Sequence, residues 1–252
     1  MPDVFWNRMR AAELVELARQ DAIVLLPVAA TEQHGPHLPT GVDTFLCEEA
    51  CRRTAELVQR SRPCVVAPTL WAGLSEHHVA YGGTFTLSLP TWHAVLRGLC
   101  EAIGRAGFTK IVVVNGHGGN VAALNALTVE ITRETGLAIA TTTYAFMAKE
   151  EVAAILEDQD GAMHACEAET SMIMAIRPEL VDTARLPDAW GPNATRDSAL
   201  ARPVHMWKSF QDMTPSGVFG DARRASPEKG ERLLDAYAAD LAKRLVAGEP
   251  WD

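Results

Sequence analysis

One short stretch of the chain concentrates side chains that bind metals or move protons. Glu32, His34 and Asp43 lie within the sequence Glu-Gln-His-Gly-Pro-His-Leu-Pro-Thr-Gly-Val-Asp, whose glycines and prolines exclude a continuous helix. Imidazole nitrogens and carboxylate oxygens are ligands that suit zinc, manganese or iron. Taken singly, a turn histidine, a surface glutamate and a capping aspartate need no special function. Taken together, they predict a metal site.

The spacing within this stretch suggests how the ligands divide. Glu32 and His34 are two residues apart, so in extended backbone they project to the same side. This arrangement suits two ligands that enter one site or that serve two adjacent ions. Asp43 lies beyond the proline-rich turn, from where it can return to the cluster and bridge two ions with its two oxygens.

A second motif, Asn-Gly-His-Gly-Gly-Asn, covers residues 115–120 and contains His117. Gly118 and Gly119 allow the backbone to approach a ligand closely and permit positive φ, so they are candidate substrate-binding residues. A phosphate-binding loop before a helix is the competing functional interpretation. The motif lacks the Lys-Ser/Thr pair of a P-loop, which weakens that alternative. A structural turn histidine is the other alternative.

A third group, His164, Glu167 and Glu169, lies at the expected start of a helix. Helical spacing places Glu167 beside His164, whereas Glu169 lies well round the helix. Glu169 can therefore work with His164 only if the histidine precedes the helix. The alternative without catalysis is an acidic first turn that the helix dipole stabilises.

The polar segment 75–84 contains His77 and His78, and one or both of these histidines are expected to face the substrate. A simpler interpretation, for at least one of them, is an ordinary surface histidine. Segments 71–84 and 187–220 are expected to form the pocket walls. Four tryptophans are candidates for lining the pocket, although packing in the core or in an interface is favoured for any one of them. These candidates are Trp71, Trp92, Trp190 and Trp207.

Strands and helices are expected to alternate along the chain, which predicts a mostly parallel sheet with helices on both faces. This is a three-layer α/β/α fold, and it is expected to form one domain over residues 1–252. Ligands of such sheets collect at the carboxyl ends of the strands, where residues 32–43 and His117 both fall. Residues 187–225 are expected to form an extended loop. The expected strands are 21–30, 64–68, 110–115 and 138–144, and the expected helices are 44–59, capped by Asp43 or Thr44, then 91–106, 121–135, 166–177 and 227–246.

Composition excludes several functions. The chain has 252 residues, of which 48% are hydrophobic, and a formal net charge of −9, which argues against nucleic acid as a partner. No apolar run is long enough to span a bilayer, and no signal-peptide layout is present, so no membrane partner is expected. The five cysteines form no CxxC pair and are expected to be reduced, as in a cytoplasmic protein.

With these motifs assembled, the chain resembles the creatininase (creatinine amidohydrolase) family. The resemblance runs from residues 32–43 through 75–84, 115–120 and 164–171 to 217–230, and so covers nearly the whole chain. It implies a creatininase-like α/β/α fold, two divalent metal ions (Zn, Mn or Fe), and hydrolysis of a C–N amide bond in a small molecule, with a metal-bridged water as nucleophile. It also implies a homo-oligomer, often a hexamer.

The resemblance also implies residue roles. The matched ligand positions are Glu32, His34, Asp43, His117 and Glu169, with Glu32 and His34 serving separate ions and Asp43 joining them. His164 matches a histidine that assists proton transfer beside the scissile bond, and Glu169, as a ligand at the reacting centre, is counted with it as catalytic. His37 matches no ligand position and is expected to have a structural role. The choice of Glu169 over Glu167 rests on the resemblance and runs against the simple helical argument.

Two departures bear on the substrate. Creatinine-hydrolysing members carry a glutamate where this chain has Gly119 and a tryptophan where it has Asp160. The motif at 115–120 looks more like the branch that contains formylaminopyrimidine deformylases and the mycofactocin-precursor peptidase. The expected substrate is therefore a cyclic amide or formamide. The alternatives are a peptidase acting on a modified peptide, a two-metal phosphoester hydrolase, and a catalytically silent binding or assembly protein.

Overall fold

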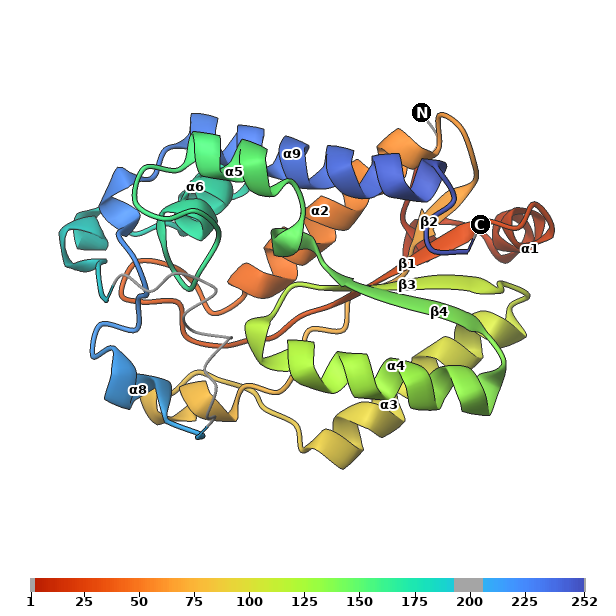
Figure 1. The fold of residues 1–252 in the computed structure, drawn as a ribbon, viewed down its shortest axis with the longest axis horizontal. Coiled ribbons are helices and arrows are strands. Elements are labelled where there is room, and N and C mark those ends of the chain that lie inside the picture. Colours follow the sequence, from red (N-terminus) through yellow and green to blue (C-terminus); the bar gives the residue numbers. More distant parts are fainter. Residues whose placement is uncertain (1–2, 193–205, 252) are drawn as a thin grey trace.

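The computed structural model describes residues 3–192 and 206–251. Its centre is a sheet of four parallel strands in the order β2-β1-β3-β4 (Figure 1). In the register of the sheet, Val28 pairs with Asn115 and Asn115 pairs with Thr143, so three strands end at one edge. The predicted parallel sheet is confirmed. The strands are β1 (Ile23–Val28), β2 (Cys64–Val66), β3 (Lys110–Asn115) and β4 (Ala138–Thr143).

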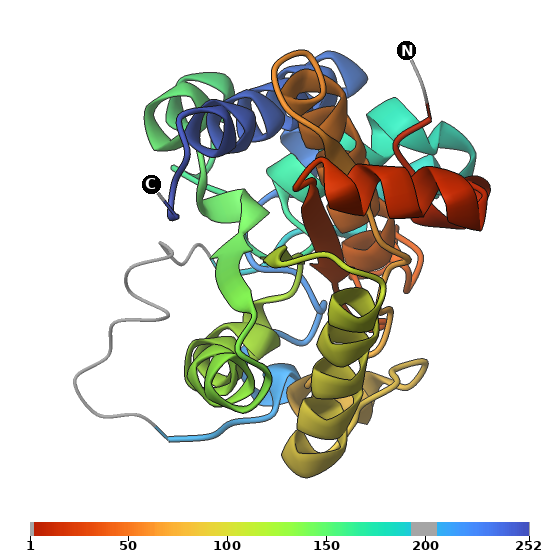
Figure 2. The same ribbon diagram turned by 90° about the vertical axis from the view of Figure 1, so that its right-hand side faces the viewer.

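Helices cover both faces of this sheet, which confirms the predicted three-layer arrangement (Figures 1 and 2). Strand β1 is buried along its whole length because Ile23 and Leu25 pack against one helical layer, whereas Val24 and Leu26 pack against the other. The first layer contains α2 (Val42–Val58), α5 (Lys149–Ile155), α6 (Glu167–Ile176) and α9 (Pro227–Val246). The second contains α1 (Ala11–Arg19), α3 (Leu89–Arg105) and α4 (Val121–Thr135).

Helix ends follow local chemistry. Helix α9 begins at the predicted Pro227, and the side chain of Ser226 accepts a hydrogen bond from the backbone of Lys229. Gly107, with φ of 97°, follows the end of α3 and gives the predicted stop. The predicted cap of α2 is wrong: Gly41 is the N-cap, and Asp43 lies inside the first turn with no capping hydrogen bond. Its carboxylate is therefore available to the site.

Several short elements differ from the sequence-based expectation. Helices α1 and α5 have no counterpart in it, and α8 (Phe210–Met213) lies within the segment expected to be extended loop. Residues 193–205 of that segment lie outside the described part of the chain. The 3₁₀ helices are η1 (Trp6–Arg8), η2 (Glu76–Tyr81), η3 (Gly118–Asn120), η4 (Tyr144–Phe146), η5 (Pro178–Leu180), η6 (Thr183–Asp188) and η7 (Ala222–Arg224).

The four tryptophans that were candidates for the pocket wall differ in burial. Trp92 of α3 is fully buried in the core, where its Nε1 donates to the carbonyl of Ala72, so it lines no pocket. The other three, Trp71, Trp190 and Trp207, are all at least half exposed. Within residues 3–192 and 206–251, every helix is too short or too polar to cross a bilayer.

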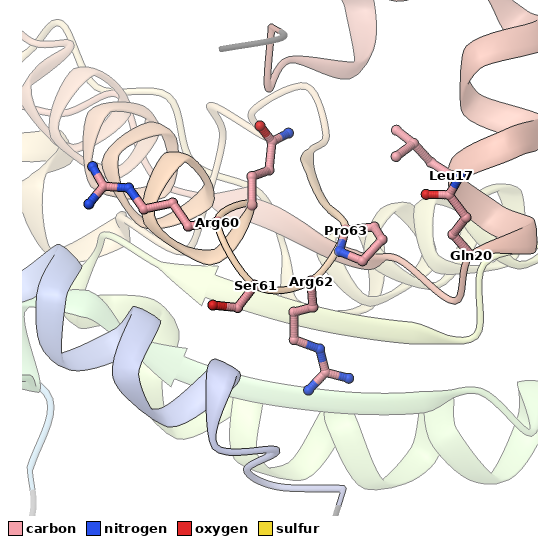
Figure 3. A pocket seen from close by; sticks show the side chains of 7 residues that line it. Leu17, Gln20, Arg60, Ser61, Arg62 and Pro63 are labelled. Carbon is pink, nitrogen blue, oxygen red and sulfur yellow. The ribbon is translucent and has the colours of Figure 1, made fainter.

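A hollow of about 360 Å³ opens at the amino ends of the strands, between the end of α1 and the connection from α2 to β2 (Figure 3). Its lining residues are Leu17, Gln20, Gln59, Arg60, Ser61, Arg62 and Pro63. This lining includes no carboxylate and no imidazole. The predicted carboxylate and imidazole residues follow the strands at the opposite, carboxyl edge of the sheet.

Candidate metal centre

The carboxyl edge of the sheet brings together the motifs that are far apart in the sequence. The chain leaves β1 into residues 32–43 and leaves β3 into the turn of His117. The side chain of Asn115 holds this turn, because its Oδ1 accepts from the backbone N–H of His117 at 3.1 Å and its Nδ2 donates to the His117 carbonyl at 2.7 Å. The expected convergence of the two motifs is therefore present.

Five predicted ligands form one buried cluster around Asp43. Nε2 of His34 lies 3.1 Å from Oδ1 of Asp43 and 3.7 Å from Oε2 of Glu169. Nδ1 of His117 lies 3.0 Å from Oδ2 of Asp43 and 3.3 Å from Oε1 of Glu32. The two carboxylate oxygens of Asp43 thus face two different histidines. The five residues are between 1% and 9% exposed.

The tautomers of these histidines follow from their backbone contacts, because a carbonyl oxygen can only accept a hydrogen bond. Nδ1 of His34 lies 3.1 Å from the carbonyl of Glu32, and Nε2 of His117 lies 3.2 Å from the carbonyl of Leu74. Each of these nitrogens therefore carries the hydrogen. The other nitrogen of each ring presents a lone pair to carboxylate oxygens. This acceptor-to-acceptor arrangement requires a cation, either a proton or a metal ion, between the groups.

The carboxylates carry a second indication of a cation. Oε2 of Glu32 and Oδ2 of Asp43 are buried and make no hydrogen bond to any described residue. Three carboxylates share the cluster, and all their ion pairs within the described ranges are to histidines, never to Lys or Arg. Buried carboxylate oxygens that receive no hydrogen bond are costly unless they coordinate a metal. The donor set of imidazole nitrogens and carboxylate oxygens fits Zn or Mn.

The pKa values of the cluster residues reflect this crowding of charges. Burial opposes protonation of His34, but the carboxylates of Asp43, Glu169 and Glu32 outweigh it and raise the pKa of His34 to about 9. The pKa of His117 is raised well above its usual value for the same reason, against the effect of its burial. Burial raises the pKa of Glu169 to about 7. Protons can therefore occupy the positions between imidazole and carboxylate that suit a metal ion.

Three further histidines surround the cluster. Nδ1 of His164 lies 3.6 Å from Oε1 of Glu32, and Nε2 of His78 lies 3.3 Å from the same oxygen. The ring of His78 stacks on that of His164 at 4.5 Å between centroids, and the ring of His77 stacks on that of His117 at 5.7 Å. Burial, followed by the neighbouring histidines, holds the pKa of His164 well below its usual value. His164 is therefore neutral in this environment.

Two glutamates of α6 occupy different environments. Oε2 of Glu167 accepts from the backbone N–H groups of Glu157 and Asp158, both at 3.0 Å, and its Oε1 pairs with Nζ of Lys229 at 2.5 Å. Glu169 faces His34, and its Oε2 accepts from the backbone N–H of Ala165 at 2.5 Å. Glu167 is thus engaged away from the cluster, whereas Glu169 belongs to it.

His164 reaches the cluster because it lies before α6, at a bend in the chain. Ala165 adopts the left-handed conformation, with φ of 52°, immediately before the N-cap Cys166. This conformation turns the backbone so that His164 and Glu169 both face the ligands. Such a position for alanine is uncommon, and nothing in the sequence indicates it.

The remaining predicted residues lie nearby in different settings. Gly118 is exposed and has open space where a Cβ would be, whereas a Cβ at Gly119 would collide with the carbonyl of Leu74 and with the ring of His117. His37 is buried, and its Nε2 is 2.7 Å from Oγ1 of Thr170. This contact joins His37 to α6 and not to the cluster, and its structural role stays a prediction.

Two residues beside the cluster have no place in the sequence-based expectation. Gln33 contacts both His78 and His164 through its side-chain amide. Phe210 of α8 packs against the same two rings, at 4.2 Å and 4.8 Å between centroids. The position of Gln33 between two predicted ligands was a signal for its involvement, whereas Phe210 is an unremarkable residue in an irregular segment.

Comparison with known proteins agrees with this geometry. The family model described as creatininase, creatinine amidohydrolase, matches residues 7–245. A mycofactocin precursor peptide peptidase of Mycolicibacterium smegmatis is 31% identical, over 90% of this chain and 86% of the relative. A 3-dehydro-scyllo-inosose hydrolase of Thermotoga maritima is 30% identical, over 98% of this chain and 86% of the relative.

The fold is that of solved creatininases. A crystal structure of creatinine amidohydrolase superposes with a TM-score of 0.85 at 25% identity and covers 99% of both chains. Creatininase structures of a Zn–Zn type and of a manganese form give TM-scores of 0.83 and 0.79 at 24% identity, each over at least 98% of both chains. The match along nearly the whole sequence, together with the buried histidine and carboxylate cluster, shows that this chain is a hydrolase of the creatininase family.

Proposed function

We propose that this protein is a dinuclear metal-dependent amidohydrolase that cleaves a C–N amide bond in a small molecule such as a cyclic amide or a formamide. The observation that carries the proposal is the pair of imidazole lone pairs, on His34 and His117, that face opposite oxygens of one buried aspartate. Two cations held there would both contact Asp43. One ion would also be held by His34 and Glu169, and the other by His117 and Glu32.

Two divalent cations, when bound, acidify water to a nucleophile near neutral pH and polarise an amide carbonyl. The rest of the chemistry belongs to the chain. Nε2 of His164 donates to the carbonyl of Gln33 at 2.8 Å, so the lone pair on Nδ1 faces the centre. His164 is neutral and can therefore take a proton from the attacking water at Nδ1. It then delivers this proton to the departing nitrogen.

The wall beside His164 supports an amide substrate over a phosphoester. The rings of Phe210, His77 and His78 pack together beside His164. No described Lys or Arg forms an ion pair with the three carboxylates of the cluster, so we find no basic side chain placed there to hold a phosphate. Neutral amide groups need no such partner, whereas phosphoryl groups are usually clamped by cationic side chains as well as by metals.

A peptidase acting on a modified peptide is the second candidate. Two relatives of this chain, at 29% and 31% identity, are mycofactocin precursor peptide peptidases. The same ions and the same proton transfer at His164 would serve a peptide bond. The two candidates differ only in the size of the group that the pocket accepts.

A panel of substrates tests both candidates. Protein loaded with Zn²⁺ or Mn²⁺ is assayed against lactams, formamides, short peptides and a phosphodiester. Turnover of a lactam or formamide, abolished by chelator and restored by either metal, is the expected result. Turnover of peptides alone would transfer the proposal to the second candidate. Turnover of the phosphodiester alone, or of none of these compounds, would refute it and favour the phosphoesterase or the silent binding protein.

We also infer a homo-oligomer, with a hexamer as the expected size. Trp71 and Phe85 are 50% and 60% exposed, and their rings meet edge to face at 5.4 Å between centroids. Together with the exposed Leu89 they present apolar surface of the kind that marks protein contacts. Light scattering coupled to size-exclusion chromatography would give the assembly size, and a monomer would contradict this inference.

A further inference from the structure

Gln33 is a buried amide whose orientation is set entirely by the backbone. Its Oε1 accepts from the backbone N–H of Gly35 at 2.8 Å, and its Nε2 donates to the carbonyl of Gly217 at 3.3 Å. These two backbone groups cannot exchange donor and acceptor roles, so they determine which end of the amide is nitrogen. Gly217, with φ of 76°, also leaves room for the amide, because a Cβ there would collide with Oε1.

The amide in turn sets the tautomer of His78. One hydrogen of Nε2 is used by Gly217, and the other is directed at Nδ1 of His78, 2.9 Å away. Nδ1 of His78 must therefore accept, and the neutral ring carries its hydrogen on Nε2. That nitrogen lies 3.3 Å from Oε1 of Glu32. His78 thus presents an N–H group to a candidate ligand and helps to orient it.

The backbone of the same residue sets the tautomer of His164. The carbonyl of Gln33 lies 2.8 Å from Nε2 of His164 and can only accept, so the hydrogen of this ring is also on Nε2. Nδ1 is left with its lone pair on the side of Glu32, at 3.6 Å from Oε1. The amide nitrogen of Gln33 lies 3.0 Å from Nε2 of His164 as well, but the carbonyl oxygen is the closer partner of that ring nitrogen and can only accept.

We propose that Gln33 is a positioning residue that holds both His78 and His164 in the Nε2–H tautomer, so that His78 donates to Glu32 while His164 presents its Nδ1 lone pair to the reacting centre. One residue thereby gives two adjacent imidazoles opposite roles. Outer hydrogen-bond partners of this kind typically change activity or metal affinity by about 10- to 100-fold when they are removed. The effect on turnover rests on the proposed amidohydrolase function, whereas the tautomers do not.

Neutron diffraction of the deuterated, zinc-loaded protein tests the tautomers directly. The expected result is deuterium on Nε2 and none on Nδ1 in both His78 and His164, with the amide deuterons of Gln33 directed at Nδ1 of His78 and at the carbonyl of Gly217. Deuterium on Nδ1 of either ring would overturn the proposal. This result is independent of whether any amide is turned over.

Kinetics of Gln33→Glu test the consequence. This variant keeps the shape of the side chain but places an acceptor where Nε2 donates, so kcat should fall at least tenfold while KM changes less than threefold and the zinc content stays at the wild-type level. The matched control is Gln59→Glu, because Nε2 of Gln59 also donates to a backbone carbonyl, that of Cys64, but at the opposite edge of the sheet. It should keep the wild-type kcat. A wild-type kcat in Gln33→Glu would overturn the proposal.

Discussion

Nε2 of His34 directs its lone pair at Oδ1 of Asp43 across 3.1 Å, and both residues are almost fully buried. The second oxygen of Asp43 faces His117 in the same way at 3.0 Å. One carboxylate in the first turn of α2 therefore connects both halves of the cluster. Its removal should affect both halves at once, which distinguishes it from every other candidate ligand.

Asp43→Asn keeps the size of the side chain but removes its charge and one of its acceptor oxygens. We expect the zinc content to fall from about two ions per chain to below one and kcat/KM to fall at least tenfold, a loss of about 1.4 kcal/mol of transition-state stabilisation. Metal analysis by mass spectrometry after dialysis measures the first quantity. Retention of two ions per chain would refute the bridging role.

Glu169 and Glu167 form a matched pair for testing which carboxylate of α6 belongs to the centre. Glu169→Gln should lose metal on the His34 side and lose activity, because Glu169 faces His34. Glu167→Gln should keep its metal but lower the free energy of unfolding by about 1–3 kcal/mol, because it weakens a part-buried, charge-assisted hydrogen bond with Lys229. Urea denaturation and metal analysis of both variants separate the two roles. The reverse pattern would reinstate Glu167 as the ligand.

Chelation should reverse the dependence of stability on pH between pH 7 and 9. In the metal-free protein the pKa of His34 is raised from 6.5 to about 9, and that of His117 is raised well above its usual value. A histidine whose pKa is raised by folding contributes its full stability below pH 6.5 and loses it as the pH rises through the folded value. The free energy of unfolding should therefore fall by up to about 1.4 kcal/mol per pH unit for each such histidine.

The zinc-loaded protein should behave in the opposite sense, because metal binding requires deprotonated ligands and strengthens as the pH rises. Urea denaturation with and without chelator at pH 7, 8 and 9 makes the comparison. Histidines with lowered pKa values, such as His78 at about 3, stay neutral throughout this range and do not interfere. A metal-free protein that becomes more stable from pH 7 to 9 would contradict the acceptor-to-acceptor geometry.

Gly118 and Gly119 provide a steric test of the motif at 115–120. Gly119→Ala places a methyl group against the carbonyl of Leu74 and the ring of His117, so it should destabilise the fold by about 1–3 kcal/mol and displace His117. Gly118→Ala has open space and should leave stability and metal content unchanged. The midpoint of thermal unfolding and the zinc content of the two variants are compared with those of the wild type. Equal behaviour of the pair would show that the turn is free to rearrange.

The bounds of helices and strands could be predicted from the sequence where particular residues mark the ends of an element. Strand β3 and helices α4 and α9 begin and end as expected, because Gly136 and the Ser226-Pro227 pair mark their ends. Helix α8 is a single turn within a long irregular segment and has no such signals. Its short length leaves no hydrophobic period to recognise.

The candidate site was predictable in its residue types but not in its contacts. Glu32, His34 and Asp43 are close in sequence, and strand ends predict that His117 joins them. The contacts of His164 with Gln33, however, join residues 131 positions apart. They depend on the left-handed backbone at Ala165, which no residue preference indicates. Local pattern therefore identifies candidate ligands, whereas tautomers and orientations are set by tertiary packing.

His164 is the residue whose replacement should separate chemistry from metal binding. Its Nδ1 lone pair faces the centre while its Nε2 is held by the carbonyl of Gln33, so the ring is oriented to accept a proton and return it. We expect His164→Ala to keep about two zinc ions per chain and a KM within threefold of the wild type, while kcat falls by about 10²- to 10⁴-fold, the usual contribution of a general acid–base group.

His37→Ala is the control for His164→Ala, because it also removes a buried imidazole near the cluster, but one whose Nε2 is paired with Thr170. That change should lower stability and leave kcat within threefold. Loss of a zinc ion from His164→Ala would instead make His164 a ligand, as the neighbouring arrangement of Glu32, His34 and His164 allows. Proton transfer would then require another group, and His77, half-buried beside His117, would be the next residue to replace.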